Sequence, residues 1–166
     1  MAAVIFENIH KECLRIEEDV LYSGKSHCNA AVIWTWVHYI IGVPMTVLAA
    51  WAGIDAFSDT PELSGYLALI TAALAALQTF LGASDKASEH KSAGSKYFTL
   101  RNQTRLFREV ELSEIEKEEA IEKIRSLSND RDELNSLSPS IPYLAFFLAR
   151  KGIEGGEAQH KVDEEE

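Results

Sequence analysis

The sequence predicts an all-α membrane protein: a two-helix transmembrane hairpin, with an N-terminal amphipathic helix before it and a long cytoplasmic helical extension after it. Residues 29–53 and residues 65–83 contain no Asp, Glu, Lys or Arg, although 25% of the chain is charged. A helix needs about 20 apolar residues to cross roughly 30 Å of hydrocarbon. Neither run has the wide polar stripe of a helix that faces water. The flanking segments are too polar to wrap two such helices completely, which disfavours a soluble bundle.

The segment before the first run predicts an amphipathic helix over residues 3–22. Its apolar residues follow 3-4-3-4 spacing, which puts them on one helical face. They are Phe6, Ile9, Cys13, Ile16 and Val20. Charged residues interrupt this segment, so it is not expected to be a signal peptide.

The predicted spans contain residues that point to packing and bending. Pro44 removes a backbone hydrogen bond and predicts a kink, which is either a static bend or a hinge for gating. Small residues recur at every fourth position, where helix backbones can approach closely. They are Gly42, Thr46 and Ala50 in the first span, and Ala68, Ala72 and Ala76 in the second. These faces join either the two spans or neighbouring subunits. A homo-oligomer is expected, because two spans alone enclose no pathway.

His38 and Gln78 are the costly polar groups of the spans. At 1.5 Å per residue they lie within a turn or two of the same depth, so they are predicted to form a direct or water-mediated hydrogen bond. The alternative is that they line a polar path through the membrane.

The distribution of charge predicts the orientation of the hairpin. Lys11, Arg15 and Lys25 precede the first span, and further basic residues follow the second, whereas the acidic connecting loop has no Lys or Arg. The positive-inside rule therefore places both termini in the cytoplasm.

After the second span the pattern predicts helices over residues 84–111, 114–137 and 143–151. The second span is expected to continue into the first of these helices without a break. Ser113 and Glu116 have the spacing of a capping box for the next one. The last helix is too short to span and is expected to pack on the cytoplasmic helices, or else to lie at the membrane surface. Residues 153–166 form an acidic tail that is expected to be disordered.

Composition excludes several classes of function. The net charge of −10 speaks against nucleic-acid binding. Neither of the two cysteines sits in a metal-ligand spacing, and no catalytic motif is present. No enzymatic activity, cofactor or metal is therefore expected. Lys86 and His90 share a helical face with Gly94 just outside the membrane. That face is either a solvated or packed helix surface, or a contact for headgroups, a neighbouring subunit or an anionic ligand.

The stretch after the second span resembles a known family. Lys86–Ala87, His90, Gly94, Tyr97, Leu100 and Arg101 stand at spacings similar to those of the SLATT superfamily, the SMODS- and SLOG-associating two-transmembrane effector domain. The resemblance covers residues 5–150 and implies a single domain over residues 1–152. It also implies an effector of bacterial conflict and antiphage defence at the inner membrane. A nucleotide-producing or nucleotide-sensing partner would switch such effectors on, and pore formation or membrane disruption would then stop the infected cell. By this resemblance the protein is expected to be a standalone member, without an appended sensor domain.

Three functions follow as expectations. The leading one is an oligomeric membrane effector that acts in abortive infection. The second is a non-conducting membrane anchor whose cytoplasmic helices recruit a soluble partner. The third is a constitutive small channel or transporter, which would harm the cell without a trigger.

Overall fold

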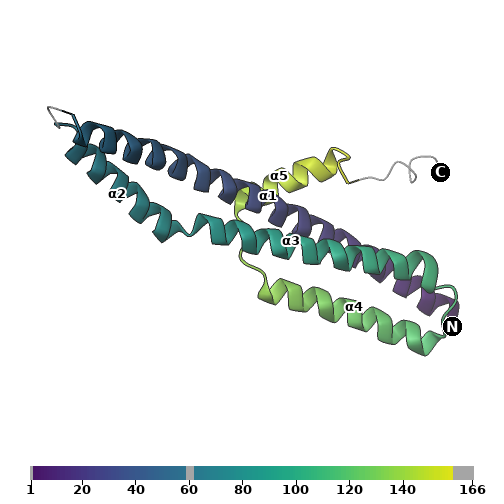
Figure 1. The fold of residues 1–166 in the computed structure, drawn as a ribbon. Coiled ribbons are helices and arrows are strands. Elements are labelled where there is room, and N and C mark those ends of the chain that lie inside the picture. Colours follow the sequence, from purple (N-terminus) through teal and green to yellow (C-terminus); the bar gives the residue numbers. More distant parts are fainter. Residues whose placement is uncertain (1, 59–61, 159–166) are drawn as a thin grey trace. The chain divides into compact units, whose positions relative to one another are not determined.

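The computed structural model describes residues 2–58 and 62–158, and every element in them is a helix (Figure 1). The elements are α1 (Ala2–Ala56), α2 (Ser64–Leu81), α3 (Ala83–Leu106), the π-helical turn η1 (Phe107–Glu111), α4 (Lys117–Leu137) and α5 (Tyr143–Glu154). The predicted all-helical fold is confirmed, and two of the helices are long and apolar enough to cross a membrane.

The chain divides into two compact units. The first comprises Met1–Ala30 and Glu89–Glu166, and is called the polar unit below. The second comprises Ala31–Ser88, and is called the hairpin. Each unit has its own internal packing.

The core of the polar unit is built on the amphipathic face that the sequence predicted for the start of α1. Ile9, Cys13, Ile16 and Val20 are all buried there. The residues that cover them come from α3, the π-helical turn, the turn that follows it, and α4 (Figure 1). These are Tyr97, Leu100, Phe107, Leu112, Ala120 and Leu127. Burial is also the main cause that raises the pKa of the Cys13 thiol to about 11, with Glu17 adding to it.

One ion pair closes the edge of this core. The Arg108 guanidinium donates from Nε to Glu17 Oε1 at 2.7 Å and from Nη2 to Glu17 Oε2 at 3.3 Å. The two side chains are only 13% and 12% exposed. Such two-pronged contacts fix the geometry of both partners. The contact therefore fixes the π-helical turn on α1, at a point 91 residues away in the sequence.

The structure corrects three predicted helix boundaries. The helices expected over residues 3–22 and 29–53 are one helix, α1, because residues 23–28 are helical too. Gly24 lets α3 approach there, since a Cβ on it would lie 3.2 Å from Tyr97 Cβ. α4 begins at Lys117 with no side-chain cap, so Ser113 and Glu116 form no capping box. The preceding π-helical turn and the turn after it move the start of α4 beyond Ser113.

The third correction concerns the end of α2. Gly82 has φ of +55° and ends α2 in the left-handed conformation, while its N–H donates to Gln78 O at 3.2 Å. The second span therefore does not run unbroken into the helix predicted over residues 84–111. Glycine adopts this conformation without the penalty that a Cβ brings.

The C-terminal prediction is also changed. α5 extends to Glu154, so the predicted disordered tail over residues 153–166 begins too early. Glu157 forms an ion pair with Lys25 of α1. Residues 159–166 of that predicted tail lie outside the described residues.

The hairpin pairs the later part of α1 with α2, which runs back alongside it (Figure 1). Asp55 Oδ2 accepts hydrogen bonds from the backbone N–H groups of Leu63 and Ser64, at 3.0 and 2.7 Å, and so satisfies donors at the start of α2.

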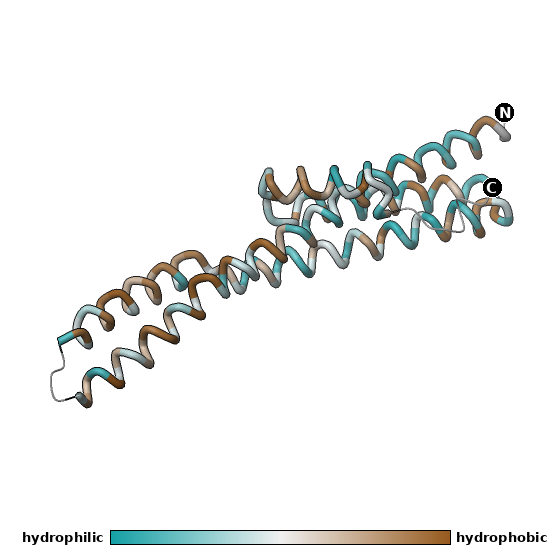
Figure 2. Tube along the Cα trace, turned by 90° about the horizontal axis from the view of Figure 1, so that it is seen from above, coloured by the Kyte–Doolittle hydropathy of each residue, from teal (hydrophilic) through white to brown (hydrophobic). Residues whose placement is uncertain are grey.

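Apolar residues predominate along both helices of the hairpin (Figure 2). α2 has no buried residue, and neither does the most apolar 18-residue window of α1. Large apolar side chains such as Trp36, Ile40, Leu69 and Phe80 are 62%, 66%, 70% and 87% exposed. A water-soluble helix pair would bury these groups.

Candidate functional site

Two polar clusters lie among these helices, one in each unit. The hairpin pair consists of His38 on α1 and Gln78 on α2. The histidine cluster consists of His27 on α1, His90 and Tyr97 on α3, and Asn135 on α4.

The predicted contact between His38 and Gln78 is confirmed, because Gln78 Nε2 lies 3.2 Å from His38 Nδ1. The buried Gln78 Oε1 has no hydrogen-bond partner among the described residues. It faces Gly42, where an added Cβ would lie 3.4 Å from it. These side chains line a groove in the surface of the hairpin, together with Tyr39, Val43, Met45, Thr46 and Val47. The groove thus offers one free acceptor in an apolar setting, where an unpaired polar atom is costly.

Pro44 lies inside α1, which continues on both sides of it. The Thr46 hydroxyl donates to the carbonyl oxygen of Gly42 at 2.9 Å within the same helix, and so satisfies its own polar group. Whether Pro44 makes a static bend or a hinge stays a prediction.

The small-residue faces do not join the two helices of the hairpin. Ala68, Ala72 and Ala76 are all exposed on α2, as are Thr46 and Ala50 on α1. Within these faces, Gly42 lies against the opposite helix, through Gln78. Packing of the two spans through these faces is therefore wrong, and a contact between subunits stays a prediction.

The structure divides the predicted junction face of Lys86, His90 and Gly94. Lys86 is exposed, and its ammonium group lies 4.5 Å from the centroid of the Trp34 ring within the hairpin. His90 is 3% exposed and Gly94 is buried, both within the polar unit. Of the alternatives for this face, the packed helix surface therefore holds for His90 and Gly94, which α1 covers, while Lys86 stays exposed.

The histidine cluster is a buried stack. His27 Nδ1 and His90 Nδ1 lie 2.8 Å apart, and the His27 ring stacks on Tyr97 with centroids 5.4 Å apart. The Tyr97 hydroxyl donates to Asn135 Oδ1 at 2.9 Å. The cluster therefore ties α1, α3 and α4 together.

Both histidines are held neutral. Burial, with a further contribution from His90, lowers the pKa of His27 to about 4. Burial also lowers the pKa of His90, against a smaller opposite effect of Glu89. One imidazole must donate and the other accept, so only one proton fits between the two Nδ1 atoms.

The remaining residues of the family-like pattern contribute to packing within the polar unit. Leu100 is 3% exposed in the core of the polar unit, and Arg101 is half-buried on α3. Gly94 allows the closest approach, since a Cβ on it would lie 2.9 Å from Cys28 Sγ and 3.1 Å from the carbonyl oxygen of Gly24.

Replacing this glycine should loosen the contact between α1 and α3. Gly94→Ala is expected to lower the free energy of unfolding by about 1–3 kcal/mol, because a backbone oxygen cannot move aside. Thermal unfolding of the full chain in mild detergent, followed by circular dichroism, measures the change. Gly53→Ala is the matched control, since nothing lies within 4 Å of a Cβ there. Equal melting temperatures for the two variants would contradict the close packing at Gly94.

Sequence reasoning missed His27, Asn135 and Trp34. His27 stands two residues before the uncharged run, and an ionisable group so near a predicted membrane boundary is a signal that was available. The roles of Asn135 and Trp34 depend on partners that are brought close only by folding. Comparisons of the chain with protein-family models, curated proteins and solved structures find no match.

Proposed function

We propose that the hairpin inserts into a bilayer, with both termini in the cytoplasm, and that the polar unit is a cytoplasmic module. The observation that carries this proposal is the exposed apolar surface of the hairpin, where α2 buries no residue at all. Lipid tails solvate such side chains, whereas water does not. The lack of Lys and Arg in the connecting loop supports the orientation.

Within that setting, the chain acts as an oligomeric inner-membrane effector of bacterial conflict and antiphage defence. The resemblance to the SLATT superfamily supports this role, together with a nucleotide-producing or nucleotide-sensing partner as the source of the signal. Several copies would enclose a pore or disrupt the membrane. The unpartnered Gln78 Oε1 beside His38 supports a polar path, because such an acceptor suits water or an ion.

Membrane conductance is the direct test. The purified protein is placed in liposomes that hold a quenched dye, and leakage is followed with and without cyclic nucleotides. Protein-dependent leakage that Gln78→Leu reduces, and that Thr79→Val leaves unchanged, is the expected result. Thr79 is a matched control because its hydroxyl bonds to the carbonyl oxygen of Ala75 in its own helix. An intact dye barrier in every condition, with insertion confirmed, would contradict the pore.

Lys86 offers a test of the junction. Lys86→Ala removes the contact with Trp34 and should change toxicity roughly 2- to 5-fold, because an exposed cation–π contact contributes about 0.5–1 kcal/mol. Colony counts after induced expression measure toxicity, and membrane fractionation checks insertion. Lys91→Ala, also exposed but in the polar unit, serves as the control. Equal killing by wild type and Lys86→Ala would remove Lys86 from the mechanism.

A non-conducting anchor is the second candidate. The polar unit has its own core and, between α3 and α4, a surface groove that a soluble partner could fill. The groove is lined by Lys96, Thr99, Gln103, Asp130, Glu133 and Leu137, among others. Replacing the hairpin with an unrelated two-span hairpin would preserve the activity of an anchor and abolish that of a pore.

A further inference from the structure

α5 buries its small side chains and exposes its large apolar ones. A helix of a water-soluble protein normally does the reverse. Its fully buried residues are the small ones, Ala145 and Ala149. Five large apolar residues lie on its exposed sides. They are Tyr143, Leu144, Phe146, Phe147 and Leu148, which are 83%, 55%, 42%, 50% and 43% exposed.

This arrangement is unfavourable in water. Burying a large apolar side chain stabilises a protein in water, so five neighbouring ones left exposed forgo a large stabilisation. A contiguous patch of this kind marks a surface for a partner or a membrane. α5 also ends with exposed basic residues, Arg150 and Lys151, of which Arg150 donates to Glu154 at 2.7 Å.

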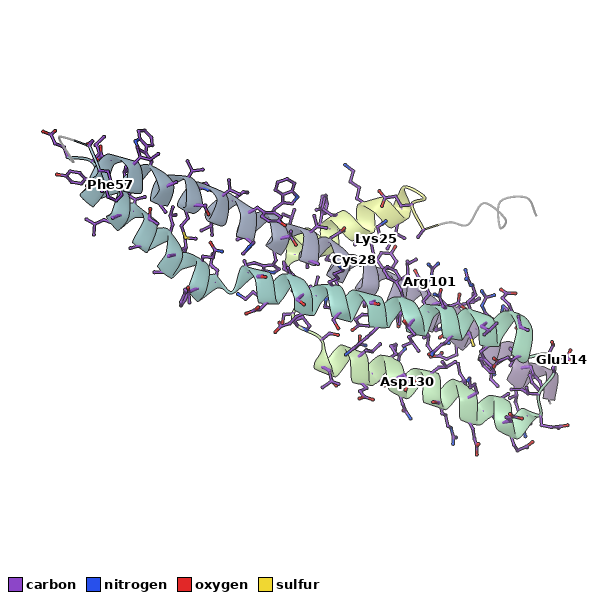
Figure 3. The ribbon with its side chains drawn as sticks, in the orientation of Figure 1. Lys25, Cys28, Phe57, Arg101, Glu114 and Asp130 are labelled. Carbon is purple, nitrogen blue, oxygen red and sulfur yellow. The ribbon has the colours of Figure 1, made fainter. Side chains whose placement is uncertain are left out.

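Contacts within the polar unit fix where α5 meets α1. Asn29 Nδ2 donates to the carbonyl oxygen of Ala145 at 3.3 Å, and Lys25 pairs with Glu157 just beyond α5 (Figure 3). Asn29 is also the first residue of the uncharged run over residues 29–53. If that run crosses a bilayer, Asn29 marks the level at which α1 enters it, and Ala145, near the start of α5, is held beside Asn29.

We propose that α5 is an interfacial helix, whose exposed apolar face lies in the boundary between the lipid headgroups and the acyl chains. Phe146, Phe147 and the neighbouring leucines enter the acyl region, and Tyr143 has the amphipathic ring that favours this depth. Arg150 and Lys151 meet anionic headgroups. This inference rests on the proposed membrane insertion and adds a third point of contact between chain and lipid.

Photocrosslinking from single positions tests the inference. A benzophenone amino acid replaces Phe147 in the full chain, which is reconstituted in phosphatidylethanolamine–phosphatidylglycerol vesicles and irradiated. Mass spectrometry then measures the phospholipid adduct. Leu106, which is 53% exposed on α3 of the polar unit, is the matched control for the 50% exposed Phe147. Phe80, which is 87% exposed on the hairpin, reports insertion independently.

The expected result is lipid adduct at positions 147 and 80, at least about tenfold above the adduct at position 106. Adduct at position 80 with none at 147, or with a crosslinked dimer at 147, would overturn the interfacial helix and leave the membrane hairpin standing. A dimer would assign the face to a second copy of the chain. Absence of adduct at position 80 would overturn membrane insertion itself, and with it the inference on α5.

Discussion

Phe107→Ala is expected to lower the free energy of unfolding of the chain by about 3–5 kcal/mol. The Phe107 ring is fully buried, at 0% exposure, in the π-helical turn that closes the core of the polar unit. Its loss leaves a cavity against the buried face of α1. The melting temperature in mild detergent should fall by roughly 6–20 °C for a chain of this size.

The residue next to it supplies the control. Leu106 is 53% exposed, so Leu106→Ala should change the melting temperature by only a few degrees. A similar loss in both variants would mean that the π-helical turn does not form the packed core described above.

Acid should destabilise the polar unit before its carboxylates titrate. The folded pKa of His27 is about 4, below its ordinary value of 6.5, so the unfolded chain binds a proton that the folded chain does not. The stabilisation is complete above pH 6.5 and is lost as the pH falls toward 4. The loss in the free energy of unfolding reaches about 3 kcal/mol, because each unit of difference between the folded and unfolded pKa of His27 is worth about 1.4 kcal/mol.

Melting temperature measured against pH checks this expectation. His90→Gln should flatten the profile between neutral pH and pH 5, because it removes one of the two titrating rings and the proton conflict between them. His10→Gln, which removes an exposed imidazole of the same unit, should keep the wild-type profile. Stability that stays constant down to pH 5 in the wild type would contradict the neutral, buried pair.

The sequence predicted what depends on local pattern. Regular spacing placed Ile9, Cys13 and Ile16 on the face of α1 that is buried. Counting the rise per residue along two antiparallel helices brought His38 and Gln78 together. The first argument needs only one helix, and the second needs two helices joined by a short connection.

The remaining features depend on contacts across long sequence separations. Nothing near His90 reveals that His27, 63 residues earlier, covers it. The left-handed turn at Gly82 lies in an apolar stretch that reads as continuous helix, and a helix can also contain a glycine. The exposed aromatic face of α5 could not be assigned either, because amphipathic spacing shows that two faces differ and does not show which one the protein covers.

The polar unit is assembled from two ends of the chain, and this has a consequence for its biosynthesis. Glu17 leaves the ribosome 91 residues before Arg108, and the whole hairpin is made in between. If the hairpin inserts into a membrane as proposed, it can meet the insertion machinery while the apolar stripe of the first helix still lacks its cover. Until the last third of translation, this stripe is therefore exposed on the nascent chain, where a chaperone can bind it. The polar unit would then close last, after its two halves have been separated by a membrane-insertion event.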